Sequence, residues 1–590
     1  MLEHSRGRSQ SGLVTVGPDD VRYGDLAGRG SRRFAGKPDY VQLVSSREDV
    51  VEAVQDAVRK RLRVAVRSGG HCLEAFVSDP EVRVVIDTSL MSGVYFDANV
   101  GAFAVEPGTR LGEAYQRLFL GWGLTIPAGV SPNVGIGGHV VGGGFGFLCR
   151  QYGLASDYLY GVEVVVVDDT GTSSSVVATR EPGDPNRDLW WAHTGGGGGN
   201  FGVVTKYWFR SPGADGLDPA GLLPKAPESV LTFTAQWDWQ DLDQQSFTRL
   251  VRNYGDWCEQ NSGWGAPATE LYSTLAVGRR QHGTVELTGL TTAKTHPDGL
   301  LDEHLAAIND GVDVPHTQVR KTKSWLEHAL DPAPGLAGVN LEHATFKLKD
   351  ALLRGRFTDK QIEVAYHHLT RTDHDVGLTW GMATYGGKVN TMAPEETASA
   401  HRDSILTTSV TAGWEDPVDE DVTMMWVRRF YRDLFHDTGG VPILADVSSG
   451  ASINHADIDL ADPAWNTSGV PWHTIYYGKT TVASNGSKPA GIRSISSTTH
   501  CPYVLRDNAQ ARCYYGWLRR FQRCCTLLLY SAGSRSYERR VEVSVSPRRP
   551  RLTLPLLVGP RTQSCMKTGS AHWPRAIRAL FLQLTARRVK

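Results

Sequence analysis

The sequence predicts an α+β protein with two domains, the first of which is interrupted by the second. Glycine-rich segments and a strand–helix–strand pattern are concentrated in residues 1–215, which form the first part of one domain. Glycine thins out in residues 216–424, where amphipathic helical stretches alternate with strands, as expected of a second domain. Residues 425–479 regain the earlier character, so we expect the chain to return there to its first domain.

The first domain begins with a strand–helix–strand pattern over residues 40–67. Ser45 and Ser46 are candidate N-caps, and acidic residues three positions later complete a capping box. Apolar residues then recur at helical spacing before a second β-rich run. The small residues Ser68, Gly69 and Gly70 follow and lead to His71, so the backbone can turn tightly and approach a ligand there.

Two further segments of this domain are rich in glycine. Residues 127–146 contain eight glycines, which should prevent a regular helix or strand and should present backbone N–H groups to an anion or a flat ring. Residues 195–204 form a second such loop and run into a strand at 203–209, while residues 163–167 read as a buried strand. The spacing Gly197-x-Gly199-x-x-Gly202 matches a dinucleotide fingerprint only formally, because a β-rich run follows where a helix should begin.

The second domain should contain both sheet and helix. Residues 271–277 and 284–290 read as strands, and residues 394–406 read as a helix.

Charge and cysteine content limit the possible functions. The net charge of −1 is the sum of 20 Lys and Arg against 3 Asp and Glu in residues 480–590, and of 42 basic against 60 acidic residues before them. An acidic body argues against a nucleic-acid surface. Only Cys72, Cys149 and Cys258 precede residue 480, which indicates neither a disulfide framework nor a zinc site. There is no apolar run of ~18 residues for a membrane span and no apolar signal-peptide core at the start, so we expect a cytoplasmic protein.

Four ordered motifs together resemble a known family. They are R-S-G-G-H at 67–71, G-I-G-G-H-x-x-G-G-G-F-G at 135–146, L-W-W-A-H-T-G-G-G-G-G-N-F-G-V-V-T at 189–205 and I-N-H-x-D-x-D-L at 453–460. The chain resembles FAD-linked oxidases of the vanillyl-alcohol-oxidase type and their berberine-bridge-enzyme-like branch. It is most similar to the branch members that oxidise sugars and glycosylated antibiotics, such as glucooligosaccharide oxidases and glycopeptide hexose oxidases. The resemblance implies a split FAD domain and a substrate domain built on a large antiparallel sheet.

The resemblance also implies how FAD is held. His71 matches the histidine that bonds covalently to the flavin, and Ser131 stands where many relatives have a second, cysteine tether. Since a hydroxyl is far less nucleophilic than a thiolate, a single tether is expected. Cys72 adjoins His71, but its side chain should point elsewhere. The residues expected to contact FAD are Arg67, Ser68, Gly69, Gly70, His71, Ser131, Val134, Gly137, Gly138, Gly142, Gly143, Gly144, Gly197, Gly198, Asn200 and Val203.

The expected reaction is the oxidation of an alcohol. Relatives carry a tyrosine at the third position of I-N-Y, where this chain has His455, and an imidazole with its typical pKa of ~6.5 can accept a proton near neutral pH. Tyr385 matches a second substrate-site tyrosine of relatives. The resemblance implies that hydride passes from the alcohol to flavin N5 and that O₂ reoxidises the flavin, giving hydrogen peroxide. Val134 matches a position where a small side chain admits oxygen, while Asp457, Asp459 and Trp472 are expected to be structural.

Other functions stay open. The substrate could be a non-sugar alcohol, or the reaction could close a C–C or C–N bond, because the motifs lie on the flavin side. His455 could instead mark lost activity, and with Ser131 it motivates a second hypothesis, a catalytically silent flavin-binding protein. A nicotinamide-dependent dehydrogenase is the weaker competitor.

The tail suggests a disrupted reading frame. Residues 480–590 contain 17 Arg against 3 Lys and five of the eight cysteines, with poor periodicity. Restoring one G after the codon of Lys479 permits an amphipathic helix followed by Trp-Asp-Pro and an aromatic residue, which resembles the usual ending of berberine-bridge-like oxidases. We interpret the tail as frameshifted and assign it no function. The alternative is a natural basic extension.

Overall fold

The computed structural model describes residues 12–30, 33–34, 36–215, 218–331, 345–373, 375–478 and 492–493. The predicted absence of a signal peptide concerns residues outside this part, and so does the frameshift interpretation of the tail, apart from the short strand β18 (Ile492–Arg493). No helix among the described residues is long and apolar enough to cross a membrane.

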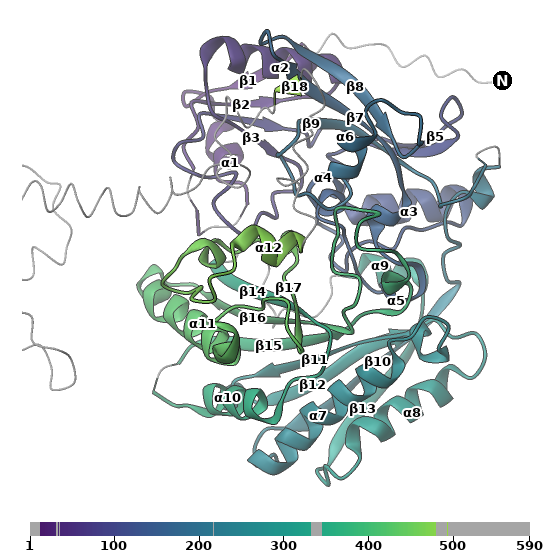
Figure 1. Ribbon diagram of the computed structural model, residues 1–590, viewed down its shortest axis with the longest axis vertical. Coiled ribbons are helices and arrows are strands. Elements are labelled where there is room, and N and C mark those ends of the chain that lie inside the picture. Colours follow the sequence, from purple (N-terminus) through teal and green to yellow (C-terminus); the bar gives the residue numbers. More distant parts are fainter. Residues whose placement is uncertain are drawn as a thin grey trace, which may run out of the picture. The chain divides into compact units, whose positions relative to one another are not determined.

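Two sheets form the glycine-rich part of the chain (Figure 1). The first has the order β1-β2-β4-β3, with β2, β4 and β3 parallel. The second has the order β18-β7-β9-β6-β5, with β8 paired to β7, and all its pairs are antiparallel. The strands are β1 (Val14–Val16), β2 (Tyr40–Leu43), β3 (Val64–Arg67), β4 (Val84–Asp87), β5 (Val94–Asp97), β6 (Ala102–Val105), β7 (Leu159–Asp168), β8 (Ser173–Thr179) and β9 (Val203–Phe209). The helices are α1 (Tyr23–Ala27), α2 (Arg47–Lys60), α3 (Leu111–Trp122), α4 (Ile136–Val141), α5 (Cys149–Tyr152) and α6 (Arg187–Ala192).

Helix α2 confirms the strand–helix–strand prediction. Ser46 caps it by accepting a hydrogen bond from the backbone N–H of Asp49 at 3.1 Å, and the Asp49 carboxylate accepts one from the Ser46 N–H at 3.1 Å. The apolar residues at helical spacing, among them Val50 and Val54, pack on Ile86 of the first sheet and Val203 of the second. This small core holds β3 in place, and β3 ends at the predicted His71 loop.

An eight-stranded antiparallel sheet forms the other part of the structure, as the resemblance implied (Figure 1). Its order is β13-β10-β12-β11-β15-β16-β14-β17. The strands are β10 (Ser229–Asp238), β11 (Leu271–Gly278), β12 (Thr284–Thr291), β13 (His316–Ser324), β14 (Thr345–Leu353), β15 (Gly377–Thr384), β16 (Leu406–Trp414) and β17 (Ser448–Gly450). The helices that follow the first domain are α7 (Gln244–Asn261), α8 (Pro297–Asn309), α9 (Trp325–Leu330), α10 (Asp359–Thr370), α11 (Glu420–Leu434) and α12 (Trp472–Tyr477).

Alternation along the strands gives this sheet two apolar faces. Trp380 and Met382 of β15 point into a large core shared with α7, α8, α10 and α11. Tyr272 and Leu352 point the other way, into a smaller cluster with Phe145 and neighbouring residues of the glycine-rich part. The second face therefore lies against the predicted cofactor segment, so a site between the sheet and this segment is expected there.

Helix α11 spans the predicted domain boundary at residue 424. It contacts β14 and β16 and contributes Trp426, Val427 and Phe430 to the core on the first face of the sheet. The exact domain limits stay a prediction.

Two secondary-structure predictions are wrong. Residues 127–146 were expected to contain no regular helix, yet Ile136–Val141 form α4, because Ile136, Val140 and Val141 bury themselves in a core despite the flanking glycines. Residues 394–406 were expected to be helical, but residues 394–405 run as an irregular segment and Leu406 begins β16. Their polar groups bond to residues far along the chain: the Ala398 N–H donates to Thr194 Oγ1 at 2.9 Å, and Arg402 pairs with Asp157 at 2.7 Å.

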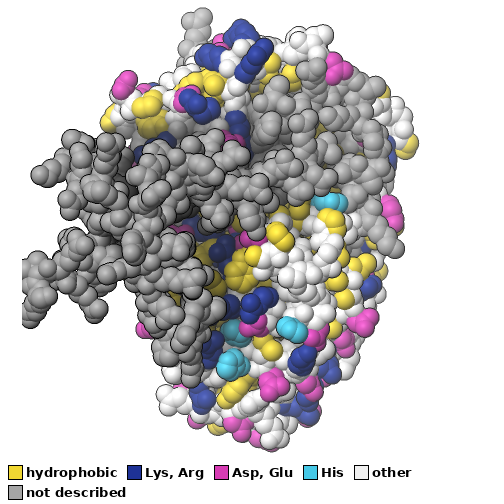
Figure 2. Space-filling view, turned by 60° about the vertical axis from the view of Figure 1, so that its left-hand side comes forward, with side chains coloured by type: hydrophobic (Ala, Val, Ile, Leu, Met, Phe, Trp, Pro, Cys, Tyr) yellow, Lys and Arg dark blue, Asp and Glu magenta, His cyan; other side chains and the backbone are white. Residues whose placement is uncertain are grey.

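The surface drawn in Figure 2 carries basic and acidic side chains interspersed among the described residues. Ion pairs at the protein surface include Arg320 with Asp298 and Asp302, and Lys360 with Asp437.

His304 on α8 predicts an acid-sensitive core. The residue is fully buried, its ring lies 4.2 Å from that of Trp257, and among the described residues neither ring nitrogen has a hydrogen-bond partner. Burial, aided by Arg150, lowers the pKa of His304 to about 3. A histidine whose folded pKa is depressed contributes full stability above ~pH 6.5 and loses it as the pH falls through the range down to its folded pKa, because the unfolded chain takes up the proton first.

We therefore expect His304→Leu to weaken the pH dependence of stability. Between pH 8 and pH 5 the wild-type chain should lose about 2 kcal/mol more unfolding free energy than the variant. Urea denaturation at both pH values measures the difference. An identical pH dependence in the two proteins would show that His304 is already solvated or protonated in the folded state.

Candidate active site

The first and second predicted segments meet backbone to backbone. A Cβ atom on Gly69 would lie 2.3 Å from the Gly135 nitrogen, and one on Gly135 would lie 2.2 Å from the Gly69 nitrogen. Only glycine fits at both positions, so the close approach explains two glycines of the motifs. The loop that carries His71 is thereby packed on the start of α4.

Side chains around His71 fix its loop. Arg67 is buried and its Nε lies 2.8 Å from Asp87 Oδ2, while Ser68 Oγ donates to the Pro107 carbonyl at 2.6 Å. Gly70 has φ +83°, which favours glycine. His71 itself is partly exposed at the end of this rigid turn.

Asn454 joins the second segment to the I-N-H motif. Its side chain accepts a hydrogen bond from the Gly144 N–H at 3.1 Å and donates one to the His139 carbonyl at 2.9 Å. A Cβ on Gly142 would lie 2.4 Å from the Asn454 amide nitrogen, and Gly143 and Gly144 have φ +105° and +70°. The short 3₁₀ helix Ile453–His455 is therefore clamped against the glycine segment.

The third segment lies beside the second. The Gly197 N–H donates to the Val141 carbonyl at 2.9 Å, and Tyr477 of α12 and Asn200 both donate to the Gly196 carbonyl, at 3.1 and 2.8 Å. Strand β9 starts at Val203 directly after this loop, which confirms that no Rossmann helix follows the fingerprint.

Several residues predicted to contact FAD pack against other parts of the protein. Val203 packs in the core under α2, and the Asn200 amide holds its own loop. A Cβ on Gly137 would meet the Pro107 carbonyl at 2.8 Å. Ser131 and Val134 form one turn, in which the Val134 N–H donates to the Ser131 carbonyl at 3.3 Å, and both are partly exposed. Their contacts with FAD stay predictions.

The two predicted catalytic residues both contact the ring of Phe145. The Phe145 ring centroid is 5.4 Å from that of Tyr385 and 6.0 Å from that of His455, in edge-on geometry both times. Burial raises the pKa of Tyr385 well above its usual value, so its phenol keeps its proton.

Asp350, which sequence reasoning missed, pairs with His455. Its Oδ2 lies 3.2 Å from His455 Nδ1 and accepts the Ser452 N–H at 3.2 Å. The Asp350 side chain is 4% exposed and that of His455 is 35% exposed. Burial raises the pKa of Asp350, while the hydrogen bond and charge of His455 oppose that rise. Asp350 could not be found from a motif, because it lies 105 residues before His455 in a strand whose sequence has no feature that indicates a site.

A small cavity lies beside these residues. It is lined by Gly142, Gly143, Gly144, Phe145 and Gly195 from the glycine segments and by Leu352, Tyr385, His401, Ser452 and Tyr476 from the opposite side, among others.

The residues around the glycine segments fit a flavin nucleotide. A Cβ on Gly138 or Gly199 would meet nothing within 4 Å, so these backbones face open space. His139 Nε2 is buried and has no hydrogen-bond partner among the described residues. Burial, with a smaller effect of His455, lowers the pKa of His139 to about 4, so the ring is neutral near pH 7. The open backbones at Gly138 and Gly199 can accept a flat ring ligand, while the unpartnered His139 Nε2 lies next to Gly144 and Gly129, where a Cβ atom would be 2.7 and 3.2 Å away.

Cys72 is a poor alternative tether. Its thiol donates to the Glu74 carbonyl at 3.2 Å, and burial raises its pKa to about 11. The thiolate needed for attack is therefore scarce near neutral pH.

Comparisons with known proteins identify the family of the chain. A family model for an FAD binding domain matches residues 38–173. Aclacinomycin-N/aclacinomycin-A oxidase from Streptomyces galilaeus is 48% identical over 475 residues, which cover 80% of this chain and 86% of that protein. The chain belongs to the berberine-bridge-enzyme-like family of FAD-linked oxidases.

Two further relatives of this FAD-linked oxidase support the assignment. Hexose oxidase from Chondrus crispus is 30% identical over 73% of this chain and 84% of that protein. The crystal structure of a glycopeptide hexose oxidase complexed with teicoplanin has a TM-score of 0.76 and 47% identity, covering 79% of this chain and 94% of that chain. The expected fold, the FAD-dependent oxidoreductase class and the family are thus confirmed.

Proposed function

We propose that this oxidase removes hydride from an alcohol group of a sugar or of a glycosylated natural product, with His455 as the general base. The observation that carries the proposal is the hydrogen-bonded pair of His455 and buried Asp350 beside the glycine-lined segment. The substrate class is supported by the relatives named for aclacinomycin, hexose and glycopeptide oxidation.

His455 is arranged to take a proton at Nε2. Nδ1 is engaged by Asp350, which leaves Nε2 for the substrate hydroxyl, and the side chain is exposed enough to be reached. The Asp350 carboxylate stabilises the imidazolium that forms when the proton arrives. A bound FAD would supply the hydride acceptor and pass the electrons to O₂, which yields hydrogen peroxide.

Tyr385 has a different role in this proposal. Because burial keeps its phenol protonated, Tyr385 would donate a hydrogen bond to the substrate oxygen rather than accept a proton. His71 would hold FAD covalently, and Ser131 in place of a cysteine leaves a single tether.

A substrate panel tests the function. Purified protein is incubated with free hexoses, oligosaccharides, glycosylated aglycones and the matching aglycones, and hydrogen peroxide is measured. We expect peroxide from at least one sugar-bearing class and none from the bare aglycones. Turnover of aglycones alone would reject the sugar proposal, and flavin-loaded protein without turnover on any compound would favour the silent flavin-binding hypothesis.

We expect His71→Ala to abolish covalent flavin. After acid denaturation, the wild-type protein should be heavier than its sequence mass by one FAD and should give a yellow precipitate. Unmodified peptides containing Ser131 would show that the tether is single. His71→Ala should release all flavin into the supernatant. A colourless wild-type precipitate with free flavin would reject the tether while leaving the fold assignment intact.

A further inference from the structure

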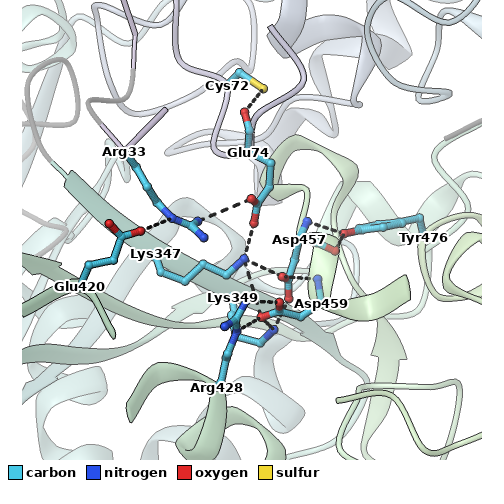
Figure 3. Close-up of polar contacts among 10 residues, drawn as sticks. All are labelled: Arg33, Cys72, Glu74, Lys347, Lys349, Glu420, Arg428, Asp457, Asp459 and Tyr476. Carbon is cyan, nitrogen blue, oxygen red and sulfur yellow. Dashed lines mark hydrogen bonds and ion pairs between the residues drawn. The ribbon is translucent and has the colours of Figure 1, made fainter. Parts of the chain in front are cut away.

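A cluster of buried charges links the His71 loop to the His455 loop (Figure 3). The buried ion cluster consists of Glu74, Lys347, Lys349, Arg428, Asp457 and Asp459. Both lysines lie on β14, the strand that also carries Asp350, and Arg428 comes from α11. The three basic and three acidic groups of the cluster balance in formal charge, and all but Arg428, which is 25% exposed, are at most 3% exposed.

Lys347 is the member that contacts both loops. Its ammonium group pairs with the carboxylate of Glu74, three residues after His71, and lies 2.7 Å from Asp457 Oδ1, two residues after His455. All three side chains are at most 3% exposed. Arg33 adds a second contact to Glu74 at 3.5 Å.

Lys349 is the second buried lysine of the cluster, and its ammonium group also lies 4.8 Å from the centroid of the Tyr431 ring. It is also 3% exposed, and it pairs with Asp457 and, at 3.0 Å, with Asp459. Among the described residues its ion pairs are with Asp457 and Asp459 and not with Glu74, so they hold only the His455 loop. Two adjacent inward-facing lysines of one strand therefore provide a matched comparison.

The charges in this cluster resist rearrangement. Burial acts to lower the pKa of Lys347, but Asp457 and Glu74 outweigh it and raise the pKa above its usual value. Lys347 thus stays charged, and any movement of either loop away from it would leave a buried charge without its partner. Asp457 is further fixed by its backbone N–H, which donates to Tyr476 Oη at 2.8 Å.

We propose that Lys347 is a positioning residue that sets the His71 loop relative to the His455 loop. The inference rests on the proposed roles of His71 and His455. Loss of Lys347 should weaken the hold on Glu74, so that His71 is less often placed correctly for bonding to FAD. It should also make the position of the proposed base, His455, less well defined. Loss of Lys349 should loosen only the base.

The test compares Lys347→Met with Lys349→Met in the full-length chain. Each variant removes one buried charge of the same strand, and both should unfold at a lower temperature than the wild type. We expect the fraction of protein with covalent FAD, measured by intact mass after acid denaturation, to fall at least about threefold in Lys347→Met and to stay at the wild-type level in Lys349→Met. The rate of flavin reduction by substrate should fall in both.

Glu74→Gln supplies an independent arm. It should lower the covalent fraction at least as much as Lys347→Met does, because it removes the pair with Lys347 and also the contact with Arg33, and the double variant should be no lower than Glu74→Gln alone. This variant decides the question if Lys347→Met does not fold. Equal covalent fractions in the two Met variants, or a full fraction in Glu74→Gln, would overturn the positioning role while leaving the oxidase proposal standing. A wild-type protein without covalent FAD would overturn both.

Discussion

His455→Ala is expected to lower kcat by about 10²–10⁴-fold, which is the usual contribution of a positioned general base. The fall should appear equally in the rate of flavin reduction under anaerobic conditions, because the proton leaves the substrate hydroxyl in that step. Covalent flavin content should be unchanged, since His71 lies on a different loop. Added imidazole should restore part of the activity by replacing the missing base.

A histidine far from the site provides the control for this change. His436 is exposed on the surface and pairs only with its neighbour Asp437 among its printed contacts. His436→Ala should keep wild-type kcat. Wild-type kcat in His455→Ala would remove His455 from the mechanism and return attention to Tyr385.

Asp350→Asn is expected to have the second largest effect. The amide keeps the size of the carboxylate but removes the charge that stabilises the imidazolium, and it can hold the wrong tautomer of the ring. We expect a loss in kcat of at least about 10-fold, with ~10⁴-fold as the upper bound set by the corresponding change in a serine-protease triad.

A double-mutant cycle separates catalysis from structure in this case. In the His455→Ala background, Asp350→Asn should change kcat little, because the two groups act as one unit. Additive losses would show that Asp350 serves only the packing of β14 and the segment after Ala451.

Part of the site could be predicted from the motifs, because each motif is a short continuous stretch of sequence. The Ser46–Asp49 capping box, the glycines required at positions 69 and 135, and Asn454 beside His455 are all written in short stretches of sequence, and the structure brings these stretches together. The family resemblance supplied the large antiparallel sheet, which strand patterns alone could not assemble.

What the sequence could not show depends on long-range contacts. Asp350 becomes a partner of His455 only when β14 forms next to the irregular segment after Ala451, and Lys347 becomes a link only when the His71 loop folds over the same strand. The false helix at residues 394–406 has the same origin. Its local pattern is helical, but bonds to Thr194 and Asp157 outweigh that preference.

If the chain delivers hydride from an alcohol to FAD, its substrate must reduce the bound flavin in the absence of oxygen. Anaerobic mixing measures this step. Wild-type protein and a glycosylated substrate are mixed without oxygen, and the visible absorbance of oxidised flavin is followed. We predict that this absorbance is lost completely and returns on admission of oxygen, with one hydrogen peroxide formed per flavin. Flavin that stays oxidised with every sugar-bearing compound, in protein that is folded and loaded with FAD, would contradict the account.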